Sequence, residues 1–199
     1  MTTEHPVAER RAVERIVLGA FGTLTGRRGE PLHFAVMDDT PVGVLGLAAG
    51  DRGLRHVSYV KGEDEFVERL LARHGDVPVL RSDRLDEVRR ALDRYFRGRR
   101  LDVDLPVDLR DVPPFNRLVL EATARIPPGQ VATYSDVASR AGSPRAQRAA
   151  GNALHDNPIA IVVPCHRVLR ADGSLGGYGG GVTIKEWLLA HEGARTATL

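Results

Sequence analysis

The chain has 199 residues, of which 42% are hydrophobic and only 5% aromatic, and its net charge of +2 is too small to indicate a nucleic-acid binder by itself. A single cysteine excludes an internal disulfide and is typical of a reducing compartment. No apolar stretch approaches the ~18 residues of a membrane span and the N-terminus lacks the apolar core of a secretory signal, so we expect a cytoplasmic protein without membrane contact.

The first half of the chain predicts an α/β domain. Residues 1–31 are charged and are predicted to be an N-terminal extension, and residues 32–98 to be the domain itself. Three runs rich in Val and Leu, separated by "DDTP" and "AGDRG", predict an antiparallel meander. Helical spacing of apolar residues predicts helices over "EDEFVERLLARHG" and "SDRLDEVRRALDRYFRG". The prolines of segment 99–114 predict a linker, and the basic "RRALDRYFRGRR" beside it is either a nucleic-acid patch or a solvated helix face.

The second half, residues 115–199, predicts a mostly helical domain. It carries nine basic and six acidic residues, so it is the half better suited to a polyanion. "FNRLVLEATARI" has a helical pattern that Pro127 ends. "AIVVPCHRVL" reads as a buried strand up to Pro164, and "TIKEWLLAHEG" as a final helix that stops at Gly193.

Two short helices between these segments form a helix-turn-helix candidate. Thr133 with Asp136 three residues later has the pattern of a capping box, and Ser143 is placed to cap the second helix. That second helix, with Arg145 and Arg148, would be the recognition helix. Ordinary helical packing is the alternative, because such helix pairs are common.

The only cysteine, Cys165, stands next to His166 in "VVPCHRV". A lone thiol usually behaves as a small buried hydrophobe. To act as a nucleophile it must be a thiolate, and an ordinary pKa of about 8.5 leaves it mostly protonated at neutral pH, so a base is needed. Neighbours on a strand point to opposite faces, so contact between Cys165 and His166 requires the strand to break, and Pro164 marks the place.

The motifs "IPPGQVATYSDVA", "GSPRAQRAAGNAL", "NPIA" with "VVPCHRV", "GGYGGG" and "KEWLLAHEG" occur in this order. Together they resemble the O6-alkylguanine-DNA alkyltransferases, densely over residues 115–193 and more loosely back to residue 32. The resemblance implies a ribonuclease H-like α/β domain followed by a mostly α domain with a winged-helix-like helix-turn-helix. It implies direct-reversal DNA repair, in which Cys165 irreversibly takes a methyl or other alkyl group from O6 of guanine, and from O4 of thymine. The resemblance further implies a single-turnover reaction that uses no cofactor and no metal.

The resemblance also implies roles for individual residues around Cys165. His166 would act as the base through a bound water, with Glu192 orienting its far side. Tyr134 would donate to the leaving base, and Asn157 would brace the active-site turn. Considered singly, Tyr134 could be a core aromatic and Glu192 a helix-end charge.

The implied partner is double-stranded DNA, bound through the minor groove with the alkylated base flipped out. Arg148 would fill the gap left by the base, and Arg167 would be structural, pairing with a carboxylate between the domains. The protein is expected to be a monomer, with clustering on DNA left open. The implied DNA-contacting residues are Tyr134, Arg145, Ala146, Arg148, Ala149 and Gly151, and the implied pocket residues are Leu154, Ala160, Val168, Tyr178 and Gly179.

Two other functions stay open at this level. One is a lesion-binding module that flips alkylguanine without repairing it, as relatives without the cysteine do; the presence of Cys165 argues against it. The other is a helix-turn-helix regulator with a structural thiol. The ordered set of motifs around His166, Tyr178 and Glu192 argues against that reading.

Overall fold

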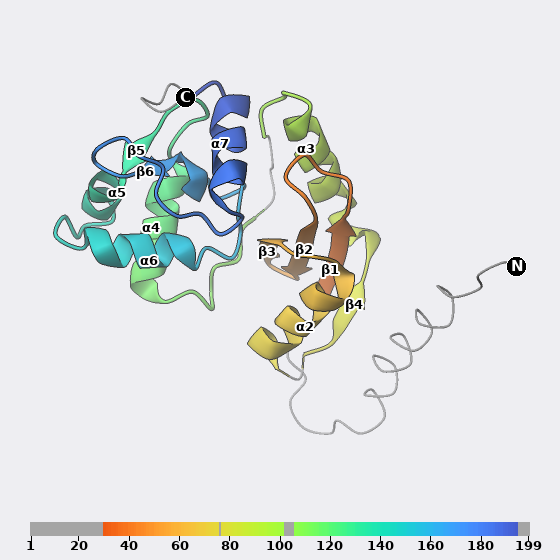
Figure 1. Ribbon diagram of the computed structural model, residues 1–199. Coiled ribbons are helices and arrows are strands. Elements are labelled where there is room, and N and C mark those ends of the chain that lie inside the picture. The colour runs from red at the N-terminus through yellow and green to blue at the C-terminus, as the bar shows by residue number, and fades with distance from the viewer. Residues whose placement is uncertain (1–29, 76, 102–105, 195–199) are drawn as a thin grey trace, which may run out of the picture.

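The computed structural model describes residues 30–75, 77–101 and 106–194, which form two domains (Figure 1). The predicted extension over residues 1–31 therefore lies almost wholly outside the described residues. The N-terminal domain comprises β1 (Leu32–Met37), β2 (Leu45–Gly50), β3 (Gly53–Tyr59), α2 (Glu63–His74), β4 (Val79–Arg81), the 3₁₀ helix η2 (Asp83–Leu85) and α3 (Asp86–Phe96). The C-terminal domain comprises α4 (Pro114–Ala124), β5 (Ala132–Thr133), α5 (Tyr134–Arg140), α6 (Gln147–His155), the 3₁₀ helix η3 (Cys165–Arg167), β6 (Val168–Leu169) and α7 (Val182–His191).

The N-terminal sheet has the strand order β3-β2-β1-β4. Strands β1, β2 and β3 pair antiparallel, which confirms the predicted meander. The parallel partner of β1, β4, was not predicted, because three residues are too few to show an alternating pattern. No helix within the described ranges is long and apolar enough to cross a membrane.

Both faces of this sheet are covered, as strand alternation requires. Phe34 on β1 packs with Phe66 of α2 on one face. Ala35, its neighbour on β1, belongs to the core on the other face together with Leu92 of α3. That second core continues into the C-terminal domain through Ile159 and Leu188, so the two domains share one apolar interior.

Local signals place most of the helices where the sequence predicts them. The capping box at the start of α5 is confirmed: the Thr133 hydroxyl accepts the Asp136 amide at 3.1 Å, and the Asp136 carboxylate accepts the Thr133 amide at 2.8 Å. Helix α6, however, begins at Gln147 and not just after Ser143. The Ala146 amide donates to the Ser143 carbonyl at 2.9 Å, closing a separate turn before the helix.

The predicted strand before the cysteine is wrong. Residues 158–161 and Val163 are buried, but the segment runs through turns, and Ile161 has a left-handed φ of 70°. Prolines at 158 and 164 remove amide donors at both ends, which prevents a continuous ladder. The predicted break at Pro164 is confirmed, because the chain turns there into the 3₁₀ helix η3 that carries Cys165.

The free edge of β3 joins the two domains. The Val57 amide donates to the Pro158 carbonyl, and the Ala160 amide donates to the Val57 carbonyl, both at 2.9 Å. Further along the same edge, Leu54 exchanges backbone hydrogen bonds with Pro106 and Asp108. An edge strand is thereby covered by the linker and by the segment next to the cysteine.

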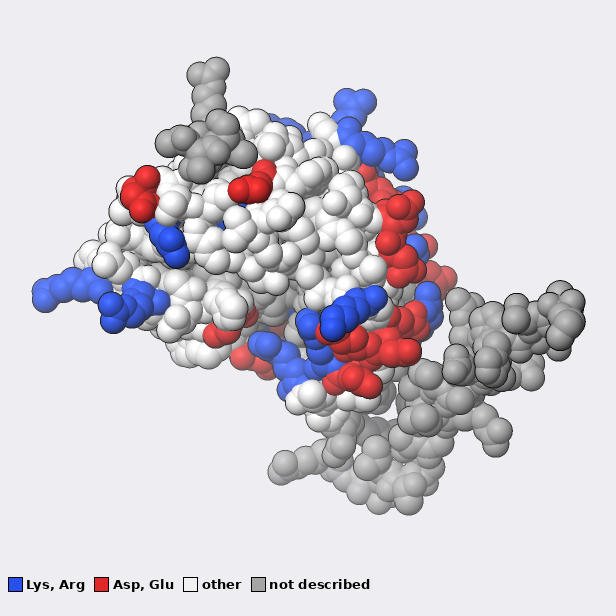
Figure 2. All heavy atoms as spheres, viewed as in Figure 1, with Lys and Arg blue, Asp and Glu red and all other residues white. Residues whose placement is uncertain are grey.

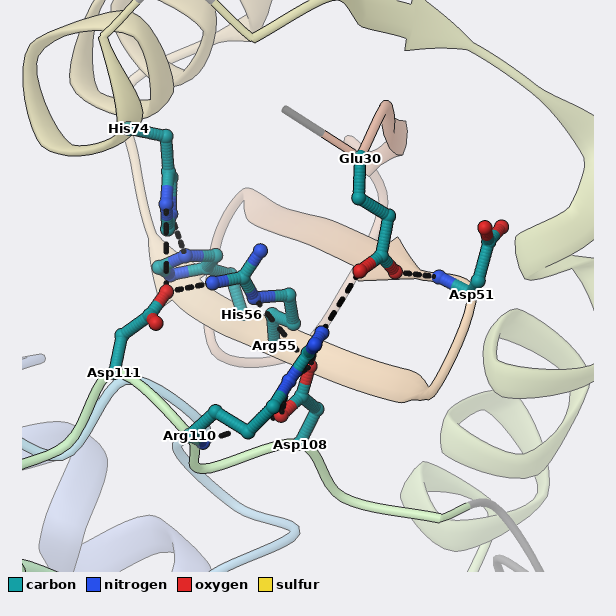
Figure 3. Close-up of polar contacts among 8 residues, drawn as sticks. All are labelled: Glu30, Asp51, Arg55, His56, His74, Asp108, Arg110 and Asp111. Carbon is teal, nitrogen blue, oxygen red and sulfur yellow. Dashed lines mark hydrogen bonds and ion pairs between the residues drawn. The ribbon is translucent and has the colours of Figure 1, made fainter. Parts of the chain in front are cut away.

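An ion-pair network fastens the linker to the sheet (Figure 3). The Asp108 carboxylate, whose side chain is 3% exposed, pairs with Arg110 at 2.6 Å and with Arg55 of β3 at 3.8 Å. Arg110 also pairs with Glu30 at 2.9 Å. A buried carboxylate needs such partners to offset its desolvation, so this network sets the path of the chain between the domains.

Candidate active site

A cavity of about 570 Å³ opens between α5, α6 and the loop that follows β6. Seven of the predicted site residues line it: Tyr134, Arg148, Gly151, Leu154, Cys165, Tyr178 and Gly179. Val168 and Ala160 are buried and lie outside its lining, so their predicted place in the pocket wall is not seen. The cavity thus brings together residues that the sequence places more than 40 positions apart.

An asparagine holds the sulfur of Cys165. The Asn157 side-chain amide donates to Cys165 Sγ at 3.1 Å and to the Val163 carbonyl at 2.9 Å. Its carbonyl oxygen accepts the Ile159 amide at 3.0 Å. One side chain therefore ties both arms of the turn together and fixes the thiol toward the cavity.

The resting thiol is protonated. Burial raises the pKa of Cys165 above its usual range. The hydrogen bond from Asn157, the positive charge of Lys185 and the backbone amides at Cys165 and His166 oppose this rise without overcoming it. Because these groups favour the thiolate, they prepare the site for deprotonation by a base.

His166 is completely buried, and its Nε2 lies 3.1 Å from Glu192 Oε1. Burial lowers the pKa of His166, so its imidazole is neutral at rest. Since Glu192 is an acceptor, the Nε2 atom carries the hydrogen and Nδ1 presents a lone pair. Nδ1 has no hydrogen-bond partner within the described residues, which leaves it able to accept a proton.

Glu192 is the centre of a buried polar array. Burial raises the pKa of its carboxyl, but hydrogen bonds from His166 and Arg167 outweigh this effect and hold the pKa well below its usual range. Arg167 contacts Glu192 through Nε and Nη2, both at 2.7 Å, and also donates to the Ile126 carbonyl. The expected pairing of Arg167 with a carboxylate is therefore confirmed: the carboxylate is Glu192 of the same domain, which also accepts a hydrogen bond from Tyr95 of the N-terminal domain.

A further link between the domains is Tyr95 of α3, which sequence reasoning missed. Its hydroxyl donates to Glu192 Oε1 at 2.8 Å, and its backbone carbonyl lies 2.6 Å from His191 Nε2. The helical pattern of α3 could have placed Tyr95 in the core, three residues after Leu92. Nothing in the sequence indicates that its hydroxyl meets a residue 97 positions away.

A buried lysine was also missed. Lys185 is 1% exposed, and its ammonium group donates to the carbonyls of Val168, at 2.6 Å, and Leu175. Burial lowers the pKa of Lys185 to about 8. These two hydrogen bonds fix both ends of the first part of the loop between β6 and α7. The ammonium group also places a positive charge near Cys165.

The remaining predicted residues lie along α5 and α6. Tyr134 begins α5, and burial raises the pKa of its phenol, so the hydroxyl stays protonated. Arg148, the second residue of α6, is exposed at the cavity, while Arg145 and Ala149 are exposed outside its lining and Ala146 is half-buried. Figure 2 shows basic side chains projecting where the turn between α5 and α6 lies in Figure 1.

Within the ranges that the structure describes, no group of three or more His, Cys, Asp or Glu side chains is placed to hold a metal ion. The fold and the site together define a two-domain protein with one cysteine nucleophile beside a buried His–Glu–Arg array.

Comparison with known proteins gives the family. A family model described as the DNA binding domain of 6-O-methylguanine DNA methyltransferase matches residues 114–194, and one described as its ribonuclease-like domain matches residues 32–109. The methylated-DNA–protein-cysteine methyltransferase of Methanosarcina acetivorans is 37% identical over 168 residues, covering 82% of this chain and 99% of its own. That of Mycolicibacterium paratuberculosis is 40% identical, covering 77% of this chain and 88% of its own.

Solved structures agree. The O6-methylguanine methyltransferase of Mycobacterium tuberculosis aligns with a TM-score of 0.69 at 34% identity, covering 81% of this chain and 93% of that one. The same organism's protein in complex with DNA aligns with a TM-score of 0.67 at 34% identity, covering 81% and 92%. This chain belongs to the 6-O-methylguanine DNA methyltransferase family.

The buried array predicts how stability depends on pH. The folded-state pKa of Glu192 lies below its ordinary value of 4.5, so its contribution to stability is present above about pH 4.5 and is lost as the pH falls further. Glu192→Gln should lower the free energy of unfolding at neutral pH by about 3–5 kcal/mol, because Arg167 loses its buried partner. Urea unfolding should show that the difference in unfolding free energy between the wild type and Glu192→Gln becomes smaller below pH ~4.5. A gap that stays constant with pH would contradict this role of the carboxylate.

Proposed function

We propose that this protein repairs alkylated DNA by direct reversal, taking a methyl or other alkyl group from O6 of guanine onto Cys165. The observation that carries the proposal is a single thiol, held by Asn157 at the wall of a cavity, next to a buried neutral His166. The relatives' names and the complex with DNA support the same reaction and the same partner. Transfer from O4 of thymine is the same chemistry and is included in the proposal.

In the proposed reaction the Cys165 proton passes to Nδ1 of His166 through a bound water. The hydrogen bond to Glu192 favours the resulting imidazolium. The thiolate attacks the alkyl carbon in line, a sulfur–carbon bond forms, and the carbon–oxygen bond to guanine breaks. The electron pair of that bond leaves with the base. A thioether has no leaving group that could restore the thiol, so each molecule reacts once.

Guanine is a better leaving group if it takes up a proton as the bond breaks. Tyr134 lines the cavity together with Cys165, and its raised pKa keeps its hydroxyl protonated. We assign Tyr134 the role of proton donor to the departing base. Tyr178 and Leu154 form the walls that would hold the base and its alkyl group.

DNA is proposed to lie along α6, through its minor groove, with the target base rotated into the cavity. Arg148 is suited to fill the space that the flipped base leaves in the duplex. Its side chain is exposed at the cavity, and helix α6 holds its backbone in place. The small exposed side chain of Ala149 permits the sugar-phosphate backbone of the DNA to approach α6 closely. A ribonuclease H-like N-terminal domain, a winged-helix-like C-terminal domain, and a monomer that can cluster on DNA are parts of this proposal.

The proposed function is tested by stoichiometry. The protein is titrated with a duplex oligonucleotide that carries O6-methylguanine, and the repaired base is counted. We expect repair to stop at one equivalent per protein molecule, since Cys165 is consumed. Product in excess of protein would contradict single-turnover transfer to a cysteine, and no product would contradict the proposed function.

Arg148→Ala is expected to slow repair of the duplex substrate by roughly 10–100-fold, because extruding a base costs a few kcal/mol. Reaction with the free base O6-benzylguanine should change much less, since no stacking has to be broken. The measurement is the alkylation rate of Cys165 with each substrate.

Arg145→Ala is the matched control, because Arg145 is exposed nearby but does not line the cavity. Loss of a phosphate contact should weaken binding to all duplexes evenly and reduce the salt dependence by about one unit. Equal losses on duplex and free base in Arg148→Ala would exclude the proposed role in base extrusion.

A further inference from the structure

The N-terminal domain places one side chain directly behind the wall of the cavity. Tyr59 is the last residue of β3, and its hydroxyl lies 2.9 Å from the hydroxyl of Tyr178. The two rings meet edge to face, with centroids 5.8 Å apart. Tyr178 lines the cavity together with Cys165, and its ring stands nearly perpendicular to that of His166. The wall beside the sulfur is therefore fastened to the other domain.

The hydroxyl contact is a stable one. Of the residues that the structure describes, Tyr59 is the one whose side chain hydrogen-bonds to the Tyr178 hydroxyl. One phenol donates and the other accepts, and burial raises the pKa of both, so neither ionises near neutral pH. The edge-to-face contact of the rings adds to the hydrogen bond.

Gly180 shows how closely the loop packs on Tyr59. A Cβ atom at Gly180 would lie 2.8 Å from carbons of the Tyr59 ring, which is too close for a side chain. The φ angle of Gly180 is not in the left-handed region, so the space and not the backbone conformation requires glycine here. The loop that carries Tyr178 thus rests directly on the Tyr59 ring.

The position of Tyr59 is itself fixed. Two residues earlier, Val57 forms backbone hydrogen bonds with Pro158 and Ala160, directly after the Asn157 that holds the thiol. Strand β3 cannot shift without moving this segment. Tyr59 is therefore a rigid support and not a freely rotating surface side chain.

From these contacts we propose that Tyr59 is a positioning residue that sets the size of alkyl group the cavity accepts. The inference rests on the proposed function and deepens it. In this proposal a methyl group reaches Cys165 with Tyr178 in place. A larger group pushes Tyr178 back and so breaks its hydrogen bond to Tyr59. Tyr59 thus selects for small alkyl groups through Tyr178.

The test compares transfer of benzyl and methyl groups from otherwise identical duplex oligonucleotides. Tyr59→Phe removes the hydroxyl but keeps the ring against Gly180. We expect the ratio of the benzyl rate to the methyl rate to rise by about fivefold, the factor that one neutral hydrogen bond accounts for. Gly180→Ala, which displaces the Tyr59 ring and leaves both hydroxyls present, should raise the ratio as well. Both substitutions weaken the contact between Tyr59 and Tyr178, one by removing a hydroxyl and the other by displacing the Tyr59 ring.

Two controls separate this role from a structural one. Tyr95→Phe removes the other interdomain hydroxyl, which contacts Glu192 and not Tyr178, and should lower both rates without changing their ratio. In a Tyr178→Phe background, Tyr59→Phe should have no further effect on the ratio, because the contact is already lost. If the ratio of the benzyl rate to the methyl rate is unchanged or falls in Tyr59→Phe, the inference about Tyr59 is overturned. Methyl transfer by the wild type in the same experiment would still uphold the proposed function. A wild type that transfers neither group would overturn both.

Discussion

Cys165→Ser is expected to abolish alkyl transfer while leaving the fold and DNA binding intact. A hydroxyl is nearly isosteric with a thiol, and Asn157 can donate to it in the same way. The hydroxyl is, however, a far weaker nucleophile toward carbon and is not ionised by a neutral imidazole alone. The rate of repair should fall on the order of 10⁵-fold, as when other enzymes lose their nucleophile. The rate is measured on the methylated duplex under single-turnover conditions.

The control for this variant is binding to the same duplex, together with thermal unfolding. Both should stay close to the wild-type values, since Cys165 is half-buried at the cavity wall and replacing sulfur with oxygen leaves no large gap. Methyl transfer at the wild-type rate would show that another group is the acceptor and would contradict the assignment of Cys165.

His166→Gln is expected to lower the rate of methyl transfer by about 10²–10⁴-fold, the usual contribution of a general base. Glutamine can still hydrogen-bond to Glu192, so the buried carboxylate keeps a partner. It cannot accept the proton of Cys165, whose pKa is raised by burial. The loss should therefore be largest near neutral pH, where the thiol of the variant is protonated.

The pH profile gives this prediction its sharpest form. As the pH rises toward the pKa of Cys165, the thiol ionises without a base, and the gap between wild type and His166→Gln should narrow. Rates are compared within the pH range where thermal unfolding shows both proteins to be folded. A gap that is constant over this range would indicate that His166 supports the structure and does not take the proton.

Features encoded by neighbouring residues could be predicted from the sequence. The capping box of Thr133 and Asp136, the stop of α2 at Gly75 and the break at Pro164 each depend on a few adjacent residues. The meander was predicted for the same reason, because its strands follow one another through short turns. Cys165 and His166 are adjacent in the chain, so their motif was visible directly.

Features that depend on docking of the two domains could not be predicted. The contacts of Tyr59 with Tyr178 and of Tyr95 with Glu192 join residues 119 and 97 positions apart. No local pattern distinguishes these tyrosines from ordinary core aromatics. The buried Lys185 was missed because a lysine next to Glu186 in a helix looks like a surface charge.

Two errors have local causes. The segment before Cys165 has the apolar composition of a strand, but its two prolines and the left-handed Ile161 turn it into a buried loop. Helix α6 begins later than the Ser-Pro pair suggests, because a turn closed at Ala146 comes first. The domain boundaries, the roles of the individual site residues and the cytoplasmic location remain predictions.

The most direct test of the account is to find where the alkyl group goes. The wild-type protein is mixed with a duplex that contains one O6-methylguanine and is then weighed intact and as peptides. We predict a mass gain of one CH₂ unit per molecule, located on the peptide that contains Cys165, together with unmodified guanine in the DNA. An unchanged protein mass, or a gain on a peptide without Cys165, would contradict the central claim.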